Sequence, residues 1–102
     1  MNLVLIYITN PTEKEAKKIA KHLLDKKLIG CANIFPISSL YWWKGKIVDE
    51  KEFVLIAKTG EANFEKVKTE VEKIHSYTVP CIIRIPASAN KKYFDWISKV
   101  IR

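Results

Sequence analysis

Glycine is scarce in the 102-residue sequence, which contains only Gly30, Gly45 and Gly60. The phosphate-binding motifs G-x-G-x-x-G and G-x-x-x-x-G-K-[ST] need closely spaced glycines, because a side chain would keep the backbone away from the phosphate. Neither motif can be written with glycines so far apart. The sequence therefore excludes the common glycine-rich nucleotide-binding loops.

Cysteine and long apolar runs are scarce as well. Two cysteines without a C-x-x-C spacing give neither a disulfide framework nor a zinc-ribbon motif. The longest uncharged run, residues 28–43, contains Pro36 and is shorter than the about 20 apolar residues of a membrane span. No basic segment or small-residue cleavage site marks a secretory signal. We therefore predict a cytoplasmic protein without a membrane partner.

Acidic residues are outnumbered, with 11 Asp and Glu against 18 Lys and Arg and a net charge of +7. Such an excess favours nucleic acid, an anionic membrane or an acidic ligand as a partner. The lysines are spread over several predicted elements, however, which is typical of a solvated surface, and we predict no nucleic-acid partner. Abundant Lys and Glu without any Gln favour a thermophilic source.

Hydrophobic periodicity predicts four strands and three helices in a single domain, residues 1–102. The strands are expected at residues 3–8, 28–43, 47–58 and 81–85, and the helices at residues 12–27, 64–74 and from 90 onward. Thr12 to Glu15 match a capping box, Lys44–Gly45–Lys46 a hairpin turn, and Pro86 the end of the fourth strand. This order is the βαββαβ pattern of an α+β, ferredoxin-like two-layer sandwich, with an extra C-terminal helix.

Both faces of the predicted sheet are apolar. In strand 3–8, Leu3, Leu5 and Tyr7 alternate with Val4, Ile6 and Ile8. The two main helices of this fold cover only one face, and a bare apolar second face exceeds what a monomer usually exposes. A last helix of about 12 residues is roughly 18 Å long, too short to cover four strands. We therefore predict a homo-oligomer built through the sheets, with coverage by the C-terminal helix as the alternative.

Motifs of enzyme chemistry are missing. No serine lies in a G-x-S-x-G context, and neither histidine belongs to H-E-x-x-H. Asp25, Asp49 and Asp95 are expected on the surface, so no catalytic triad suggests itself. We predict that the protein is not an enzyme.

Three side chains are candidate ligands for a soft metal ion: His75, Cys31 and Cys81. Imidazole and thiolate together suit copper or zinc. Alternatively, the cysteines are small buried strand residues and His75 interacts with a helix C-terminus. The ferredoxin-like strand order puts the cysteines at opposite edges of the sheet, so they would meet only across subunits. His22 is expected to be a solvated surface residue.

Tyr41, Trp42 and Trp43 form an aromatic cluster at the predicted hairpin tip. Aromatic residues beside lysines can stack on bases, and they are also enriched in subunit interfaces. Strand residues 52–56 lack the basic-Gly-aromatic signature of RNA-recognition motifs. We expect these three residues to lie in an oligomer interface.

The sequence resembles the CutA family of divalent-cation tolerance proteins along nearly its whole length. The residues that carry the resemblance are Thr9 with Pro11, Cys31–Asn33, Tyr41–Ile47, Glu52, Lys58–Thr59 and His75–Pro80. The resemblance implies a cytoplasmic, ferredoxin-like trimer similar to PII signalling proteins, linked to tolerance of divalent cations and to copper binding.

Of the copper ligands that the resemblance implies, only His75 has a matching residue in this chain. A cysteine that some bacterial members have at the end of the first strand is Ile8 here, and the first histidine of a family His pair is Ile74. The proline that follows this pair is Ser76, and the glutamate that usually follows Val79-Pro80 is Cys81.

We accordingly predict a non-enzymatic homotrimer that binds divalent or soft metal ions such as copper. His75 would supply an imidazole, and Cys31 or Cys81 a thiolate, from one subunit or from adjacent ones. The alternative is a PII-like signalling trimer that binds a small anionic ligand in inter-subunit clefts, which the positive charge would favour.

Overall fold

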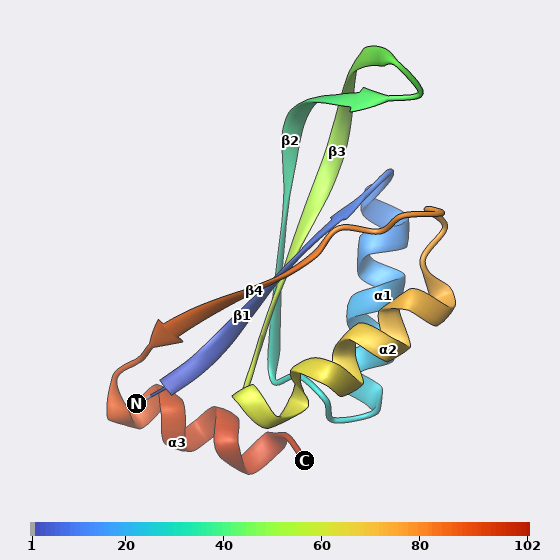
Figure 1. The fold of residues 1–102 in the computed structure, drawn as a ribbon. Helices are drawn as coiled ribbons and strands as arrows, with labels where there is room; N and C mark the ends of the chain where they lie inside the picture. Colours follow the sequence, from blue (N-terminus) through green and yellow to red (C-terminus); the bar gives the residue numbers. More distant parts are fainter. Residues whose placement is uncertain (1) are drawn as a thin grey trace.

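Four antiparallel strands form one sheet in the structure, a computed structural model that describes residues 2–102 (Figure 1). The strands are β1 (Asn2–Asn10), β2 (Cys31–Trp43), β3 (Lys46–Thr59) and β4 (Ile82–Ser88), in the spatial order β2-β3-β1-β4. The helices are α1 (Glu13–Asp25), α2 (Phe64–Ile74) and α3 (Lys91–Val100), and a short 3-10 helix, Glu61–Asn63, precedes α2. The predicted α+β element order is confirmed, and so are the positions of β2 and β4 at opposite edges.

The core lies between the sheet and the two helices that share one of its faces, α1 and α2 (Figure 1). Its fully buried members are Ile6 and Ile8 of β1, Leu55 of β3, Ile19 and Leu23 of α1, and Val67 and Val71 of α2. Spacings of three and four residues put these helical side chains on one stripe of each helix, as predicted. Burying a side chain of this size contributes about 1.5–3 kcal/mol, so this layer is the main stabilising element.

The start of α1 differs in part from the predicted capping box. The Thr12 side chain caps the helix by accepting a hydrogen bond from the backbone N–H of Glu15, at 3.1 Å. The Glu15 carboxylate does not reach back to Thr12, because it accepts two hydrogen bonds from Ser76. The helix ends at Asp25, earlier than predicted, and Lys27 has a left-handed φ of 58°.

The fourth strand is longer than predicted. Pro86 does not end β4 but lies inside it, in register with Val4 of β1. Because β4 is an edge strand with a neighbour on one side only, a residue without an N–H is tolerated there.

Strands β2 and β3 continue past the rest of the sheet as a two-stranded hairpin. Pairing between β1 and β3 stops at Asn10 with Phe53, whereas β2 and β3 remain paired from Ile37–Glu52 out to Trp43–Lys46. We call residues 37–52 the arm. Its turn has positive φ at both Lys44 (49°) and Gly45 (78°), the two-residue geometry that suits the twist of a hairpin.

The face of the sheet opposite α1 and α2, here called the open face, is apolar. Cross-strand neighbours of Tyr7 on this face are Ile56 of β3 and Ile83 of β4. Ile83, Ile85 and Phe35 are exposed. α3 covers only one end, where Ile97 is fully buried and the Lys58 ammonium lies 5.5 Å from the ring centre of Tyr93. The C-terminal helix therefore leaves much of the open face uncovered. None of the helices within residues 2–102 is long and apolar enough to cross a membrane.

Gly30, directly before β2, packs closely against α3. A Cβ atom there would lie 2.3 Å from Cγ1 of Ile97 and 3.1 Å from Cγ2 of Val100. We expect Gly30→Ala to displace α3 and to lower the free energy of unfolding by about 1–3 kcal/mol in urea denaturation. Gly60→Ala is the control, because its Cβ would lie 3.6 Å from the nearest atom, Cδ1 of Ile101. Equal losses in both variants would contradict this account of α3.

An ionic cluster joins α1 to α2. His22 is half-buried rather than solvated as predicted, because its Nε2 lies 2.9 Å from Oε1 of Glu70. Lys26 and Lys73 approach the same carboxylate at 3.4 and 3.2 Å. The hydrogen bonds from His22 and Lys73 lower the pKa of Glu70 from 4.5 to about 2.

This lowered pKa predicts a pH dependence of stability. A carboxylate whose pKa is lower in the folded chain stabilises the fold above its unfolded pKa and loses that contribution as the pH falls towards the folded value. We expect Glu70→Gln to lower the melting temperature at pH 7 and to weaken its decline between about pH 4.5 and about pH 2. Thermal unfolding followed by circular dichroism measures both effects. Glu72→Gln, on the exposed side of α2, should leave the profile unchanged; identical profiles for the two variants would refute the assignment.

Candidate functional site

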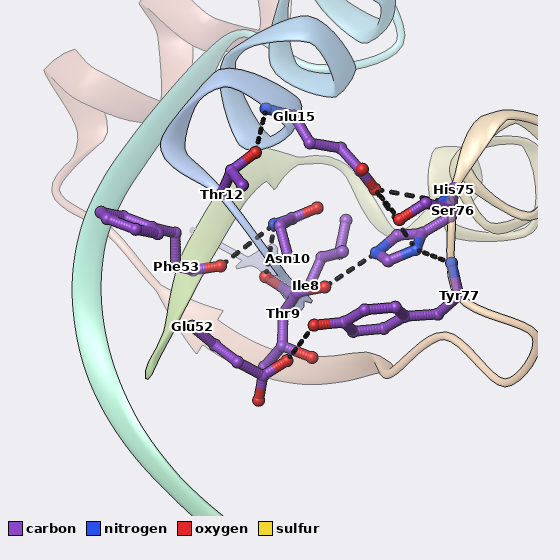
Figure 2. A network of polar contacts seen from close by, with 10 residues as sticks. All are labelled: Ile8, Thr9, Asn10, Thr12, Glu15, Glu52, Phe53, His75, Ser76 and Tyr77. Carbon is purple, nitrogen blue, oxygen red and sulfur yellow. Dashed lines mark hydrogen bonds and ion pairs between the residues drawn. The ribbon is translucent and has the colours of Figure 1, made fainter. Parts of the chain in front are cut away.

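Polar side chains gather where the segment after α2 crosses the end of β1 (Figure 2). β1 contributes Thr9, α1 contributes Glu15, and β3 contributes Glu52. The segment between α2 and β4 contributes residues 75–77 and Cys81. We call this group the polar site.

His75 is the most buried member of the polar site, with a side chain that is 0% exposed. Its Nε2–H donates to the carbonyl oxygen of Thr9 at 2.8 Å, and its Nδ1 accepts from the backbone N–H of Tyr77 at 3.0 Å (Figure 2). A carbonyl only accepts and a backbone N–H only donates, so the imidazole is neutral and protonated on Nε2. Both ring nitrogens are therefore occupied by backbone groups and are not free to bind a metal ion.

Glu15 holds the segment that carries His75. Its Oε2 accepts hydrogen bonds from the backbone N–H and the hydroxyl of Ser76, at 3.1 and 2.8 Å, and lies 3.6 Å from Nδ1 of His75. The capping box predicted that this carboxylate binds at the start of α1, because the motif is local and Ser76 is distant in sequence. The only signal for its second role was the pair of polar residues after a predicted helix.

Two tyrosine–glutamate pairs line the base of the arm. The Tyr77 hydroxyl donates to Oε2 of Glu52 at 2.6 Å, and the Tyr41 hydroxyl donates to Oε1 of Glu50. Glu52 is only 5% exposed, and the Tyr77 hydroxyl is the side-chain partner of its carboxylate. Burial, followed by the hydrogen bond to Glu52, raises the pKa of Tyr77, and the Glu50 hydrogen bond raises the pKa of Tyr41 to about 12. Both tyrosines are therefore hydrogen-bond donors at neutral pH.

Asn10, the last residue of β1, lies beside the polar site. Its side-chain amide donates to the carbonyl oxygens of Ile8 and Phe53, at 3.2 and 3.1 Å, and ties β1 to β3 beside the end of β1. Asn10 is fully buried, and its Oδ1 accepts no hydrogen bond from residues 2–102.

The two cysteines lie in different surroundings. Cys81 belongs to the polar site, beside Thr9 and near Glu52, and burial raises the pKa of its thiol. Cys31 begins β2 at the opposite edge of the sheet, where it pairs with Lys58 and lies near Tyr93 of α3. The predicted ligands therefore do not come together within one chain. Residues 2–102 contain no group of three or more His, Cys, Asp or Glu side chains that could hold a metal ion.

The aromatic cluster of the arm is split between its two faces, since neighbouring strand residues point in opposite directions. Tyr41 is paired with Val48 and Trp42 with Ile47 across the hairpin. Tyr41 and Trp43 continue the open face, whereas Trp42 is on the other face of the arm. All three are exposed in the single chain. Their predicted place in an oligomer interface stays a prediction.

The buried Tyr77–Glu52 bond leads to a test of the polar site. In Tyr77→Phe the Glu52 carboxylate stays buried without its hydroxyl donor, and we expect the free energy of unfolding to fall by about 1–3 kcal/mol. Tyr41→Phe is the matched control, because Tyr41 and Glu50 are more exposed, and its loss should be smaller. Urea denaturation at pH 7 compares them. A Tyr77→Phe variant as stable as the unmodified chain would show that the Glu52 carboxylate finds solvent or another donor.

Known proteins of one family are similar to this chain over nearly its whole length. The family model described as CutA1 divalent ion tolerance protein matches residues 4–100. The divalent-cation tolerance protein CutA of Archaeoglobus fulgidus is 50% identical over 97 residues, covering 94% of this chain and 95% of that protein. The CutA of Thermus thermophilus is 41% identical over 95 residues, covering 91% of this chain and 92% of that protein.

Solved structures show the same likeness. The structure of CutA from Archaeoglobus fulgidus superposes with a TM-score of 0.96 at 48% identity, covering 98% of this chain and 99% of that one. CutA1 from Pyrococcus horikoshii gives a TM-score of 0.94 at 37% identity, covering 97% of this chain and 98% of that one. The Archaeoglobus protein is described as periplasmic, so the predicted cytoplasmic location stays a prediction. Matching sequence, fold and strand order together place this chain in the CutA1 family of divalent ion tolerance proteins.

Proposed function

We propose that this protein serves divalent-cation tolerance as a non-enzymatic, cytoplasmic homotrimer with a ferredoxin-like subunit and a PII-like assembly. The observation that carries the proposal is the uncovered apolar part of the open face, where Phe35, Ile83 and Ile85 are exposed. Proteins in water rarely leave such a surface bare, because each buried Å² of apolar area stabilises the assembly by about 25 cal/mol. We take neighbouring copies of the same chain to be the partners that cover this face.

We further propose that a divalent ion, copper or a similar soft metal, binds at the subunit boundary. The three predicted ligands do not fit a metal within one chain, because His75 uses both ring nitrogens on backbone groups and Cys31 lies at the far edge. Cys81 lies in the polar site, where Thr9 and Glu52 are among the groups that act on its thiol. A complete set of ligands therefore needs a contribution from a neighbouring copy. Cys31 of a neighbouring copy is the candidate for this additional soft ligand. It lies at the opposite sheet edge from Cys81, so the two thiols could meet only across a subunit boundary.

Native mass spectrometry with and without Cu²⁺ or Zn²⁺ tests assembly and metal uptake together. We expect a trimer that takes up metal, with Cys81→Ser and His75→Ala weakening the affinity by about 10–100-fold, since changing a ligand or the group that positions it has effects of this size. His22→Ala is the control, because His22 lies at the α1–α2 contact. A chain that stays monomeric would refute the assembly. Trimers of all variants that bind metal equally would refute this metal site alone.

A further inference from the structure

A line of charged residues runs along the side of α1 that faces away from the sheet. Lys14, Lys18, Lys21 and Asp25 follow one another at spacings of four, three and four residues, which puts them on one side of the helix. All four residues are exposed, and the buried apolar residues of α1 lie on the opposite side. We call these four residues the charged stripe.

Nothing within the fold balances the charges of this stripe. Its four residues form no ion pair with any residue in the described range 2–102. Their neighbour Lys17, in contrast, pairs with Glu13 at 3.2 Å. Like charges three or four residues apart destabilise a helix, and Lys14 in the first turn lies near the positive end of the helix dipole. The fold itself therefore gains no stability from the lysines of the stripe.

The order of charges along the stripe restricts the kind of partner. Three positive charges are followed by one negative charge, so a nucleic acid or an anionic membrane would be attracted by the lysines but repelled by Asp25. In addition, α1 contains no aromatic side chain on which a base could stack. A peptide can carry carboxylates opposite the lysines and an ammonium group opposite Asp25. The charges therefore fit a protein segment better than a uniform polyanion.

An exposed leucine beside the stripe adds an apolar contact. Leu24 lies three residues after Lys21 and is 40% exposed. An apolar side chain of a peptide can cover this leucine while its carboxylates pair with the lysines. We propose that the outer side of α1 binds an acidic segment of a partner protein, through the charged stripe and Leu24.

This surface is separate from the one that carries the proposed function. The open face lies on the opposite side of the sheet from α1, so a neighbouring copy seated on the open face does not cover the stripe (Figure 1). The stripe also contains none of the proposed metal ligands. Failure of the proposed trimer or metal site would therefore leave this proposal standing, and the reverse holds as well.

Fluorescence anisotropy on the full chain tests the proposal. The probe is a fluorescein-labelled, alanine-based helical peptide in which three Glu and one Lys repeat the spacing of the stripe, with a Leu beside the last Glu. We expect it to bind at low ionic strength, and the triple variant Lys14→Gln, Lys18→Gln, Lys21→Gln to weaken binding by about 10–100-fold, the effect of losing three exposed charge pairs. A titration to about 1 mM peptide without a change in anisotropy overturns the proposal.

A second triple variant separates the stripe from the general positive charge of the chain. Lys17→Gln, Lys92→Gln, Lys99→Gln removes the same net charge from exposed positions but leaves the stripe intact, so peptide binding should change by no more than about 2-fold. Equal weakening in the two triple variants overturns the stripe as the binding surface. Circular dichroism compares their melting temperatures. Removal of the stripe lysines should leave the melting temperature unchanged or raise it, and a marked fall would show that these lysines serve the fold instead.

Asp25 distinguishes an acidic peptide from a uniform polyanion. Asp25→Asn removes the partner of the peptide Lys and also removes a charge that repels phosphate. It should therefore weaken binding of the peptide and strengthen binding of a poly-dT oligonucleotide in the same assay. Tighter binding of the oligonucleotide, or of vesicles of anionic lipid, than of the peptide by the unmodified chain overturns the assignment of a protein partner.

Discussion

The constraint that organises this molecule is a sheet with apolar side chains on both faces and helices on only one of them. Along β1, Ile6 and Ile8 point into the helical layer and are fully buried, while Leu5 and Tyr7 point to the open face. α3 shields one end of that face, where Ile97 fits against Gly30. The rest of that face leaves Phe35, Ile83 and Ile85 exposed, and the proposed trimer would cover them.

The polar site shows a second constraint, the need to give buried polar groups hydrogen-bond partners. The segment after α2 carries a histidine into the interior, and Thr9, Tyr77 and Glu15 between them supply its partners. Tyr77 in turn supplies the hydroxyl that the Glu52 carboxylate requires. These hydrogen bonds occupy both ring nitrogens of His75, which explains why His75 is poorly placed to act as a metal ligand without a change in its surroundings.

Predictions from local patterns were confirmed where residues close together in the sequence decide the structure. The helical stripes, the edge position of β2 with Pro36, and the Lys44–Gly45 turn were all predicted, because spacing and φ preference act over a few residues. Predictions failed where an edge or a distant partner decided the outcome. Pro86 lies inside β4 because that strand has no neighbour on its outer side, and His22 is half-buried because Glu70 of α2 lies beside it.

The sequence by itself determined the order of elements, the apolar nature of both sheet faces, and membership in a family of divalent-cation tolerance proteins. The first two properties follow from residue spacing, and the third follows from the resemblance of the sequence motifs to that family. Only the tertiary structure decided that Glu15 binds Ser76 rather than its own helix end, that His22 lies beside Glu70, and that both ring nitrogens of His75 bind backbone groups. Hydrogen bonds and contacts between distant segments depend on which segments the fold brings together, and a local sequence pattern does not predict this.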